Sequence, residues 1–303
     1  LVVGRGRTDA AGILLAFSLL AALLAAHVAS AEPRVAEPAW TCQDDVCQRA
    51  VRRGERLSIE LRNRRSHATW VSVEPFDLSN VKILGAPPFR LALRAGETKV
   101  AGTLAIEDPT KPYAYQARWQ ALPGNPDAVH DDRWRYRMPF GGTSPVRVSQ
   151  GYDGAFTHDG LGRYALDFPL PLDTPVLAAR GGTLVEIASD RATGEGSAGA
   201  SEEATDHRVV IEHADGSFGL YAHLRPESPF RVGEPVETGD RIGRSGDTGN
   251  ATGPHLHFEV YTIRRDGRRQ TIPVRFWDGT AKGFIPLAGV EYAPGSPRDA
   301  APR

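Results

Sequence analysis

Short strand-like segments recur along most of this 303-residue chain, and they constrain its fold more than any other feature does. In these segments apolar and polar residues alternate, or a brief apolar run is bounded by glycine, proline or asparagine. No stretch outside residues 10–26 has the sustained 3.6-residue apolar period of an amphipathic helix. The sequence therefore predicts a mainly β protein.

The strand-like segments fall into two groups. Alternating segments between residues 57 and 119 predict a β-sandwich-like module over residues 40–121. The polar stretch that follows is rich in proline, glycine and asparagine and predicts a linker over residues 122–138. Strand signals resume beyond it, which predicts a second domain over residues 139–290 and a disordered tail over residues 291–303. Residues 188–205, rich in Gly, Ala, Ser and Glu, predict a mobile surface loop.

The start of the chain has the three parts of a secretory signal. Arg5 and Arg7 precede an apolar run over residues 10–26, and Ala29-Ser30-Ala31 supplies small residues for cleavage. Residues 1–31 therefore predict a signal peptide and a secreted or periplasmic protein without stable membrane insertion. The alternative is a membrane anchor, but an apolar run of about 17 residues is at the short limit for spanning a bilayer.

The cysteine content fits an oxidising compartment. The chain has two cysteines, Cys42 and Cys47, which are close enough in sequence to form a local disulfide. A zinc site at this position would need further ligands nearby. The net charge of −1 argues against a nucleic-acid partner, since binding the phosphate backbone normally requires a basic excess.

Histidines gather in one third of the chain, where six of the nine lie between positions 158 and 257. His255 and His257 stand two residues apart in a strand-like run, so both imidazoles point to the same face. With His257, His158 and Asp167 are candidate ligands, and two imidazoles with one carboxylate suit Zn²⁺ with a fourth position open for catalysis. His223 and His255 remain available to move a proton or stabilise negative charge.

Five sequence blocks around these residues resemble the LytM/lysostaphin-type zinc metalloendopeptidases, which cut peptide cross-links in bacterial peptidoglycan. The resemblance covers about residues 139–262, and its blocks occur in order: Thr-His-Asp-Gly at 157–160, Ala-Leu-Asp-Phe at 165–168, residues 169–182, Leu-Tyr-Ala-His-Leu at 220–224, and residues 245–259 with Gly-Pro-His-Leu-His-Phe-Glu. Each block alone is weak, whereas the set is specific.

The resemblance implies a compact antiparallel β peptidase domain with a zinc groove and a peptidoglycan peptide substrate. Carried over by position, it implies His158, Asp167 and His257 as zinc ligands. It implies His223 and His255 as the pair that activates water and stabilises the oxyanion, with either histidine as the general base. The bond that is cleaved stays open, as does the role of the first module, which could bind substrate, cover the groove or dock a cell-envelope protein.

The spacing of the first two ligands departs from the family pattern. Family members usually have the aspartate four residues after the first histidine, whereas nine positions separate His158 from Asp167. Gly160 and Gly162 could form a longer turn that returns Asp167 to the metal. Asp159 is the rival carboxylate, but neighbouring residues on an extended chain point apart, which favours Asp167.

Two other functions compete with a peptidase. A non-catalytic adaptor of the same fold, which regulates other cell-wall hydrolases, would have an incomplete set of site residues, and here all five positions are filled. A lipoyl- or biotin-carrier-like domain also contains Gly-Asp-Arg-Ile-Gly turns, but it needs a lysine for attachment. No lysine occurs from Pro112 to Ala281, which excludes that chemistry.

Overall fold

A computed structural model of the chain describes residues 38–191 and 205–295. The predicted signal peptide and residues 192–204 of the predicted mobile loop lie outside the described residues. The chain divides into two compact units. Within the described residues, the first contains the chain from residue 38 to Arg62, Val73–Phe89 and Thr98–Trp119, and the second contains Asn63–Ser72, Arg90–Glu97 and the described chain from Gln120 onward.

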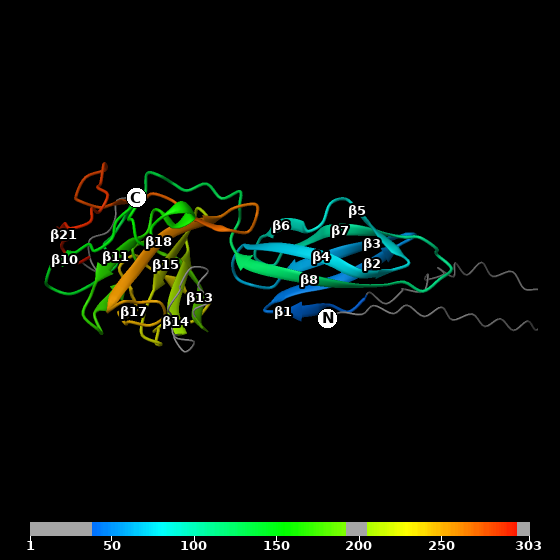
Figure 1. Cartoon of the computed structure of the whole chain (residues 1–303), viewed down its shortest axis with the longest axis horizontal. Coiled ribbons are helices and arrows are strands. Elements are labelled where there is room, and N and C mark those ends of the chain that lie inside the picture. The colour runs from blue at the N-terminus through cyan, green and yellow to red at the C-terminus, as the bar shows by residue number, and fades with distance from the viewer. Residues whose placement is uncertain (1–37, 192–204, 296–303) are drawn as a thin grey trace, which may run out of the picture. The chain divides into compact units, whose positions relative to one another are not determined.

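The first eight strands form two sheets (Figure 1). The larger has the order β1-β2-β3-β7-β5 and the smaller the order β6-β4-β8. Leu57, Ile59 and Leu61 alternate along β3 and are fully buried, as the apolar pattern predicts. The bounds are β1 (Thr41–Gln43), β2 (Val46–Arg53), β3 (Arg56–Asn63), β4 (Thr69–Ser79), β5 (Val81–Leu84), β6 (Phe89–Leu93), β7 (Thr98–Ile106) and β8 (Ala114–Pro123).

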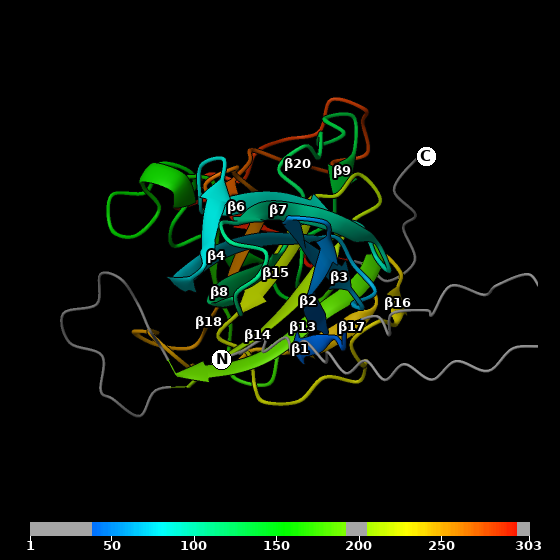
Figure 2. The ribbon, with the colours of Figure 1, turned by 90° about the vertical axis from the view of Figure 1, so that its right-hand side faces the viewer.

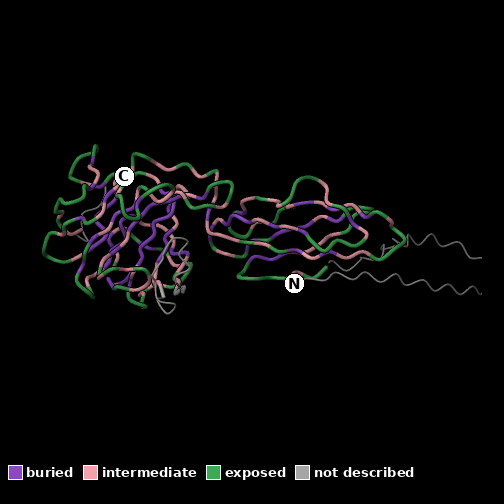
Figure 3. The backbone as a smooth tube through the Cα atoms, in the orientation of Figure 1, coloured by how far each residue is buried: buried purple, intermediate pink, exposed green. Residues whose placement is uncertain are grey.

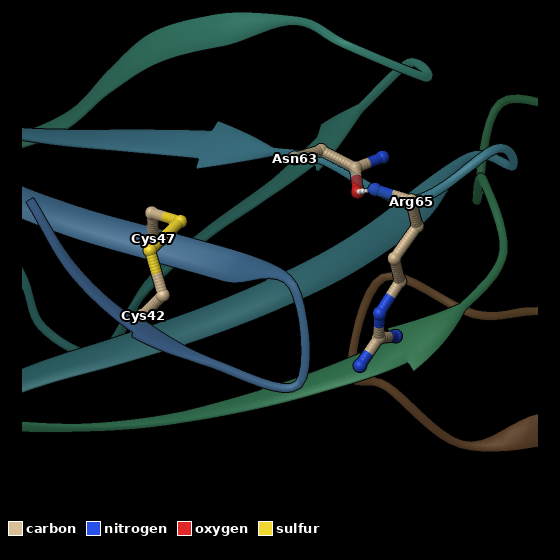
Figure 4. The surroundings of a disulfide bond; sticks show 4 residues. All are labelled: Cys42, Cys47, Asn63 and Arg65. Atoms are coloured by element: carbon tan, nitrogen blue, oxygen red, sulfur yellow. Dashed lines mark hydrogen bonds between the residues drawn. A yellow bond between two sulfur atoms is a disulfide. The ribbon is translucent and has the colours of Figure 1, made fainter.

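A disulfide joins the first two strands. Cys42 and Cys47 lie opposite each other in the β1-β2 hairpin, and their Cα atoms are 3.9 Å apart. Figure 4 shows the bridge. The predicted pairing is therefore confirmed.

A seven-stranded antiparallel sheet forms the centre of the second unit, with the order β11-β18-β15-β14-β13-β16 and with β19 paired to β18. Figure 2 shows β13, β14, β15 and β18 along this sheet. Its bounds are β11 (Leu166–Pro169), β13 (Gly182–Arg191), β14 (Thr205–Glu212), β15 (Phe218–Ala222), β16 (Pro235–Val236), β18 (His255–Ile263) and β19 (Arg269–Thr271). The remaining elements are short: β9 (Arg135–Tyr136), β10 (Val146–Arg147), the 3₁₀ turn η1 (Gly160–Gly162), β12 (Pro175–Leu177), β17 (Arg241–Arg244), β20 (Arg275–Phe276) and β21 (Glu291–Tyr292).

Both faces of the central sheet contribute buried side chains, and Figure 3 shows buried residues along its strands. Leu256, Phe258 and Val260 of β18 belong to the larger core cluster on one face, whereas Tyr261 and Ile263 belong to a smaller cluster on the other. His255 and His257 share the face of Tyr261 because side chains alternate along a strand. The face opposite the main core therefore carries the site residues.

The predicted β class is confirmed, since η1 is the single helical segment within the described residues. Among those residues, the chain also has no helix with the length and apolar character needed to cross a membrane.

Two predicted boundaries are wrong. The predicted linker over residues 122–138 belongs to the second unit, where Tyr136 is fully buried and β9 pairs in parallel with β20. The linker is predicted from the turn-forming residues in this stretch, whereas its apolar residues pack into the core. The predicted tail begins too early, because β21 pairs with β10 and Tyr292 stacks on Phe284 at a ring distance of 5.0 Å. Residues 296–303 lie outside the described chain.

Candidate metal centre and catalytic groove

Strand pairing places Asp167 beside His257. β11 and β18 are antiparallel neighbours, and their register sets Asp167 directly opposite His257. The Asp167 Oδ1 atom lies 2.9 Å from His257 Nδ1. Residues facing each other across an antiparallel pair have Cβ atoms about 5 Å apart, so the register alone brings these groups together.

A loop brings His158 to the same point. Gly160 has a φ of 49° and η1 turns the chain back, so the nine-residue step from His158 returns to Asp167. His158 is buried, its Nδ1 donates to the Gly151 carbonyl at 3.0 Å, and its Nε2 lies 3.2 Å from Asp167 Oδ2. The rival Asp159 is exposed and lies outside this cluster.

The three predicted ligand residues form one compact donor set. One ligand atom from each of His158, Asp167 and His257 lies within 4.8 Å of the other two. The buried Nε2 of His158 has no well-aligned hydrogen bond, although Asp167 is close. Its Nδ1–H is held by a carbonyl, so Nε2 carries a free lone pair aimed at the cluster. This orphaned atom and the nitrogen-rich donor set fit a tetrahedral Zn²⁺ with one open position.

An ion pair between a buried carboxylate and an exposed arginine lies behind His257. The Glu259 carboxylate, which is 3% exposed, lies 3.4 Å from His257 Nε2 and 3.0 Å from Arg269 Nε. An Nε2–H directed at Glu259 leaves the Nδ1 of His257 free to face Asp167 as a ligand atom. The orientation of His257 therefore depends on a second carboxylate on the same strand.

The carboxylates make this cluster favourable for a cation. Burial lowers the pKa of His257, but hydrogen bonds to Asp167 and Glu259 outweigh it and raise that pKa to about 9. Burial likewise raises the pKa of Asp167, but the neighbouring imidazoles of His158 and His257 hold it well below its ordinary value. Positive charge is thus stabilised between these residues, as a metal site requires.

The remaining two predicted residues stand next to the cluster. The rings of His223 and His255 are 4.5 Å apart, and the ring of His223 is 6.0 Å from that of His257. His255 Nδ1 donates to the Gly253 carbonyl at 2.9 Å, and its Nε2 lies 4.0 Å from Asp167 Oδ1. All five predicted site residues are therefore brought together.

Loop contacts hold His223 immediately after β15. Its φ of 61° is in the left-handed region, which is uncommon for a residue with a side chain and is found at functional sites. His223 Nδ1 donates to the Thr248 carbonyl at 2.8 Å, and Asp206 Oδ1 accepts from the backbone N–H of His223 at 3.3 Å. The same carboxylate oxygen lies 3.4 Å from His223 Nδ1.

These histidines open onto a groove of about 1030 Å³. Sequence reasoning did not assign several residues that line or support it: Gln150, Asp206, Glu259 and Arg269. A signal existed for Glu259, which follows His257 by two residues and so shares its strand face. For Asp206 and Arg269 the sequence carried no signal, because their proximity depends on strand order in the sheet.

A comparison with protein families points to the same part of the chain. Residues 162–271 match the model of peptidase family M23. The second unit of the chain therefore contains a segment that is similar to the M23 peptidases, and the resemblance predicted from the five sequence blocks is confirmed. The match begins four residues after His158, so it contains Asp167, His223, His255 and His257 but not the first predicted ligand.

Two relatives are bacterial proteins that are named as endopeptidases. The chain is 33% identical over 130 residues to the peptidoglycan DD-endopeptidase ShyA of Vibrio cholerae, which covers 43% of this chain and 25% of that protein. It is 40% identical over 96 residues to the DD-carboxypeptidase/endopeptidase Mpg of Neisseria meningitidis serogroup B. This match covers 31% of this chain and 19% of that protein. The chain thus spans about a quarter or less of these relatives.

Among solved structures, the chain is similar to a mutant of the catalytic domain of EnpA, a prophage-encoded M23 protein from Enterococcus faecalis. The sequence identity is 25%, the TM-score is 0.35, and the similarity covers 46% of this chain and 94% of that one.

Proposed function

We propose that this chain is an exported zinc endopeptidase that hydrolyses peptide bonds in peptidoglycan, with His158, Asp167 and His257 as the zinc ligands. The observation that carries the proposal is the compact His-Asp-His donor set beside two further histidines in one groove. Export rests on the signal pattern in residues 1–31, and the protein would act in the cell envelope. The first unit could also dock an envelope protein.

A bound Zn²⁺ would supply Lewis-acid polarisation of a water molecule and of the scissile carbonyl. Each catalytic histidine has its Nδ1–H committed to a backbone carbonyl, Gly253 for His255 and Thr248 for His223. The Nε2 lone pair of His255 is therefore available to take a proton from the attacking water. The Asp206 carboxylate stabilises a positive charge on His223, which can then donate to the developing oxyanion.

The chemistry of the relatives narrows the choice of bond. ShyA and Mpg are both named for an endopeptidase activity on DD bonds, which join two D-configured centres. We propose a DD cross-link between stem peptides as the substrate, in preference to a glycine bridge. The groove has both polar and apolar lining residues and, at about 1030 Å³, is large enough for a short extended peptide.

The test is digestion of purified peptidoglycan by the purified chain, with and without a chelator, followed by mass spectrometry of the products. We expect cross-linked dimers to be converted to monomers with one water added, and we expect chelation to stop the reaction. Cleavage of glycine bridges would support the proposed peptidase activity but contradict a DD cross-link as its substrate. Products that form equally well after chelation would contradict a zinc-dependent reaction, and no products from any peptidoglycan would instead favour the non-catalytic adaptor.

A further inference from the structure

We infer that Gln150 is a positioning residue that joins the two ligands separated by the nine-residue step, His158 and Asp167. This inference rests on the proposed zinc site and goes beyond the assignment of its ligands. Gln150 is half-buried at the edge of the groove, directly before Gly151.

The side-chain amide of Gln150 uses all of its hydrogen-bonding capacity on these two regions. Its Nε2 donates to Asp167 Oδ2 at 3.1 Å and to Thr157 Oγ1 at 2.7 Å. Its Oε1 accepts from the backbone N–H groups of Phe156 and Thr157, both at 3.2 Å. A primary amide has two donors and two acceptor lone pairs, and here all four have partners.

The backbone at this point makes the same connection. The Asp167 N–H donates to the Gln150 carbonyl at 2.9 Å, and the next carbonyl, that of Gly151, accepts from His158 Nδ1 at 3.0 Å. Two consecutive residues therefore contact both ligands, one through each carbonyl. Without such a link, the loop from Asp159 to Leu166 would set the distance between His158 and Asp167.

A small residue in the loop leaves room for this amide. A Cβ atom added at Gly154 would overlap the Cγ of Gln150. Gly154 does not have a positive φ, so its conformation permits alanine; the nearest conflict is with the Gln150 side chain, and the Gly151 carbonyl oxygen is the next, at 3.0 Å. Gly154→Ala is therefore a second way to move the amide without touching a ligand.

Gln150 contacts Asp167 and not the reacting atoms. Replacing Gln150 should therefore act mainly by weakening zinc binding. Residues that orient metal ligands typically change metal affinity or activity by about 10- to 100-fold when they are replaced. We expect Gln150→Met, which keeps the volume and removes all four hydrogen bonds, to weaken zinc affinity in that range. Gly154→Ala should weaken it in the same direction by a smaller factor.

The experiment is competition for zinc between the full chain and a chromophoric chelator, with the cobalt absorption spectrum as a second readout of ligand arrangement. The matched control is Arg163→Gln, which breaks the exposed Arg163–Asp153 ion pair between the same two segments but does not contact Asp167. Exposed pairs contribute little to stability, so this control should keep wild-type zinc affinity and cobalt spectrum. The melting temperature of the metal-free proteins reports on folding separately.

Equal zinc affinity in the wild type and Gln150→Met, within about twofold, would overturn the inference, because the 10- to 100-fold effect expected of such a residue would be missing. If Gln150→Met does not fold, Gln150→Asn decides by the same threshold, since its shorter amide cannot reach Asp167 and the loop together. A wild-type chain that binds zinc and cleaves no peptide would overturn the proposed reaction and leave the Gln150 comparison standing. A wild type without zinc affinity would overturn both.

Discussion

Strands and loops position the proposed zinc site in different ways. Asp167 and His257 lie on β11 and β18, where the antiparallel register sets one residue opposite the other. His158 and His223 lie on loops, and their rings are oriented by hydrogen bonds from Nδ1 to the carbonyls of Gly151 and Thr248. The strand pair is fixed by many backbone contacts, whereas each loop histidine depends on a few local ones. Substitutions in the strand pair and in the loops should therefore have different effects on zinc binding and turnover.

The largest effect is expected in the strand pair itself. Asp167→Asn keeps the shape of the side chain but removes the charge between His158 and His257, so zinc binding should fall by more than the roughly 100-fold upper limit for a supporting residue. Peptidase activity should be lost with it. Zinc content after gel filtration measures this directly, and Asp159→Asn is the control because Asp159 is exposed outside the cluster. A zinc-loaded, active Asp167→Asn protein would remove Asp167 from the ligand set.

The next effect should appear in turnover without loss of metal. His255→Ala and His223→Ala each remove a group that handles a proton or stabilises charge, and such groups typically contribute about 10²- to 10⁴-fold. Both variants should bind zinc like the wild type and have a lowered kcat. Parallel measurement of zinc stoichiometry and peptide cleavage tests this, and full activity in zinc-loaded His255→Ala would contradict its role as the base.

A smaller effect is expected from the support behind His257. Glu259→Gln removes the charge that accepts from His257 Nε2 and leaves the Arg269 guanidinium without its buried partner. Zinc affinity should weaken by about 10- to 100-fold. Chelator competition measures the change, and Glu259→Gln combined with Arg269→Gln should recover part of it by removing the unpaired cation. Unchanged zinc affinity in the single variant would show that the strand register alone orients His257.

The smallest effect on the site should come from His213, a histidine held in a turn outside the groove. Burial first, and then the positive charge of Arg180, lower the pKa of His213 from 6.5 to about 3, against weaker opposing effects from the Gly181 carbonyl and Asp215. The unfolded chain therefore binds one more proton between those pH values, so the free energy of unfolding falls as the pH drops from 6.5 toward 3, by at most about 1.4 kcal/mol per pH unit.

His213→Asn keeps a donor for the Gly181 carbonyl and removes this titration. Its free energy of unfolding, measured by urea denaturation at several pH values, should depend less steeply on pH in that window than that of the wild type. Zinc affinity and turnover at neutral pH should not change. Equal pH slopes in the two proteins would mean that folding does not lower the pKa of His213.

The same contrast explains what the sequence could predict. His255 and His257 were assigned correctly to one strand face because a two-residue spacing has a single meaning on a strand. The return of Asp167 to His158 was expected from Gly160 and Gly162, and η1 provides it. Such local patterns need no knowledge of the rest of the fold.

Contacts between distant segments were not predictable in this way. Gln150, Asp206 and Arg269 reach the site through loop closure and strand order, and the sequence gives no spacing rule for either. The sequence predicts a linker around Tyr136 because proline, glycine and asparagine precede it in the chain. Composition indicated a boundary there, but packing of Tyr136 against the core decided the structure.

One titration tests most directly whether the strand residues and the loop residues together bind a single metal ion that is needed for catalysis. The chain is stripped of metal, zinc is added back in fractions of an equivalent, and cleavage of purified peptidoglycan is followed at each step. We predict no cleavage without zinc and a linear rise that levels off at one equivalent, with no rise in His158→Ala. Full cleavage by the stripped chain, or a rise in His158→Ala equal to that in the wild type, would contradict the account.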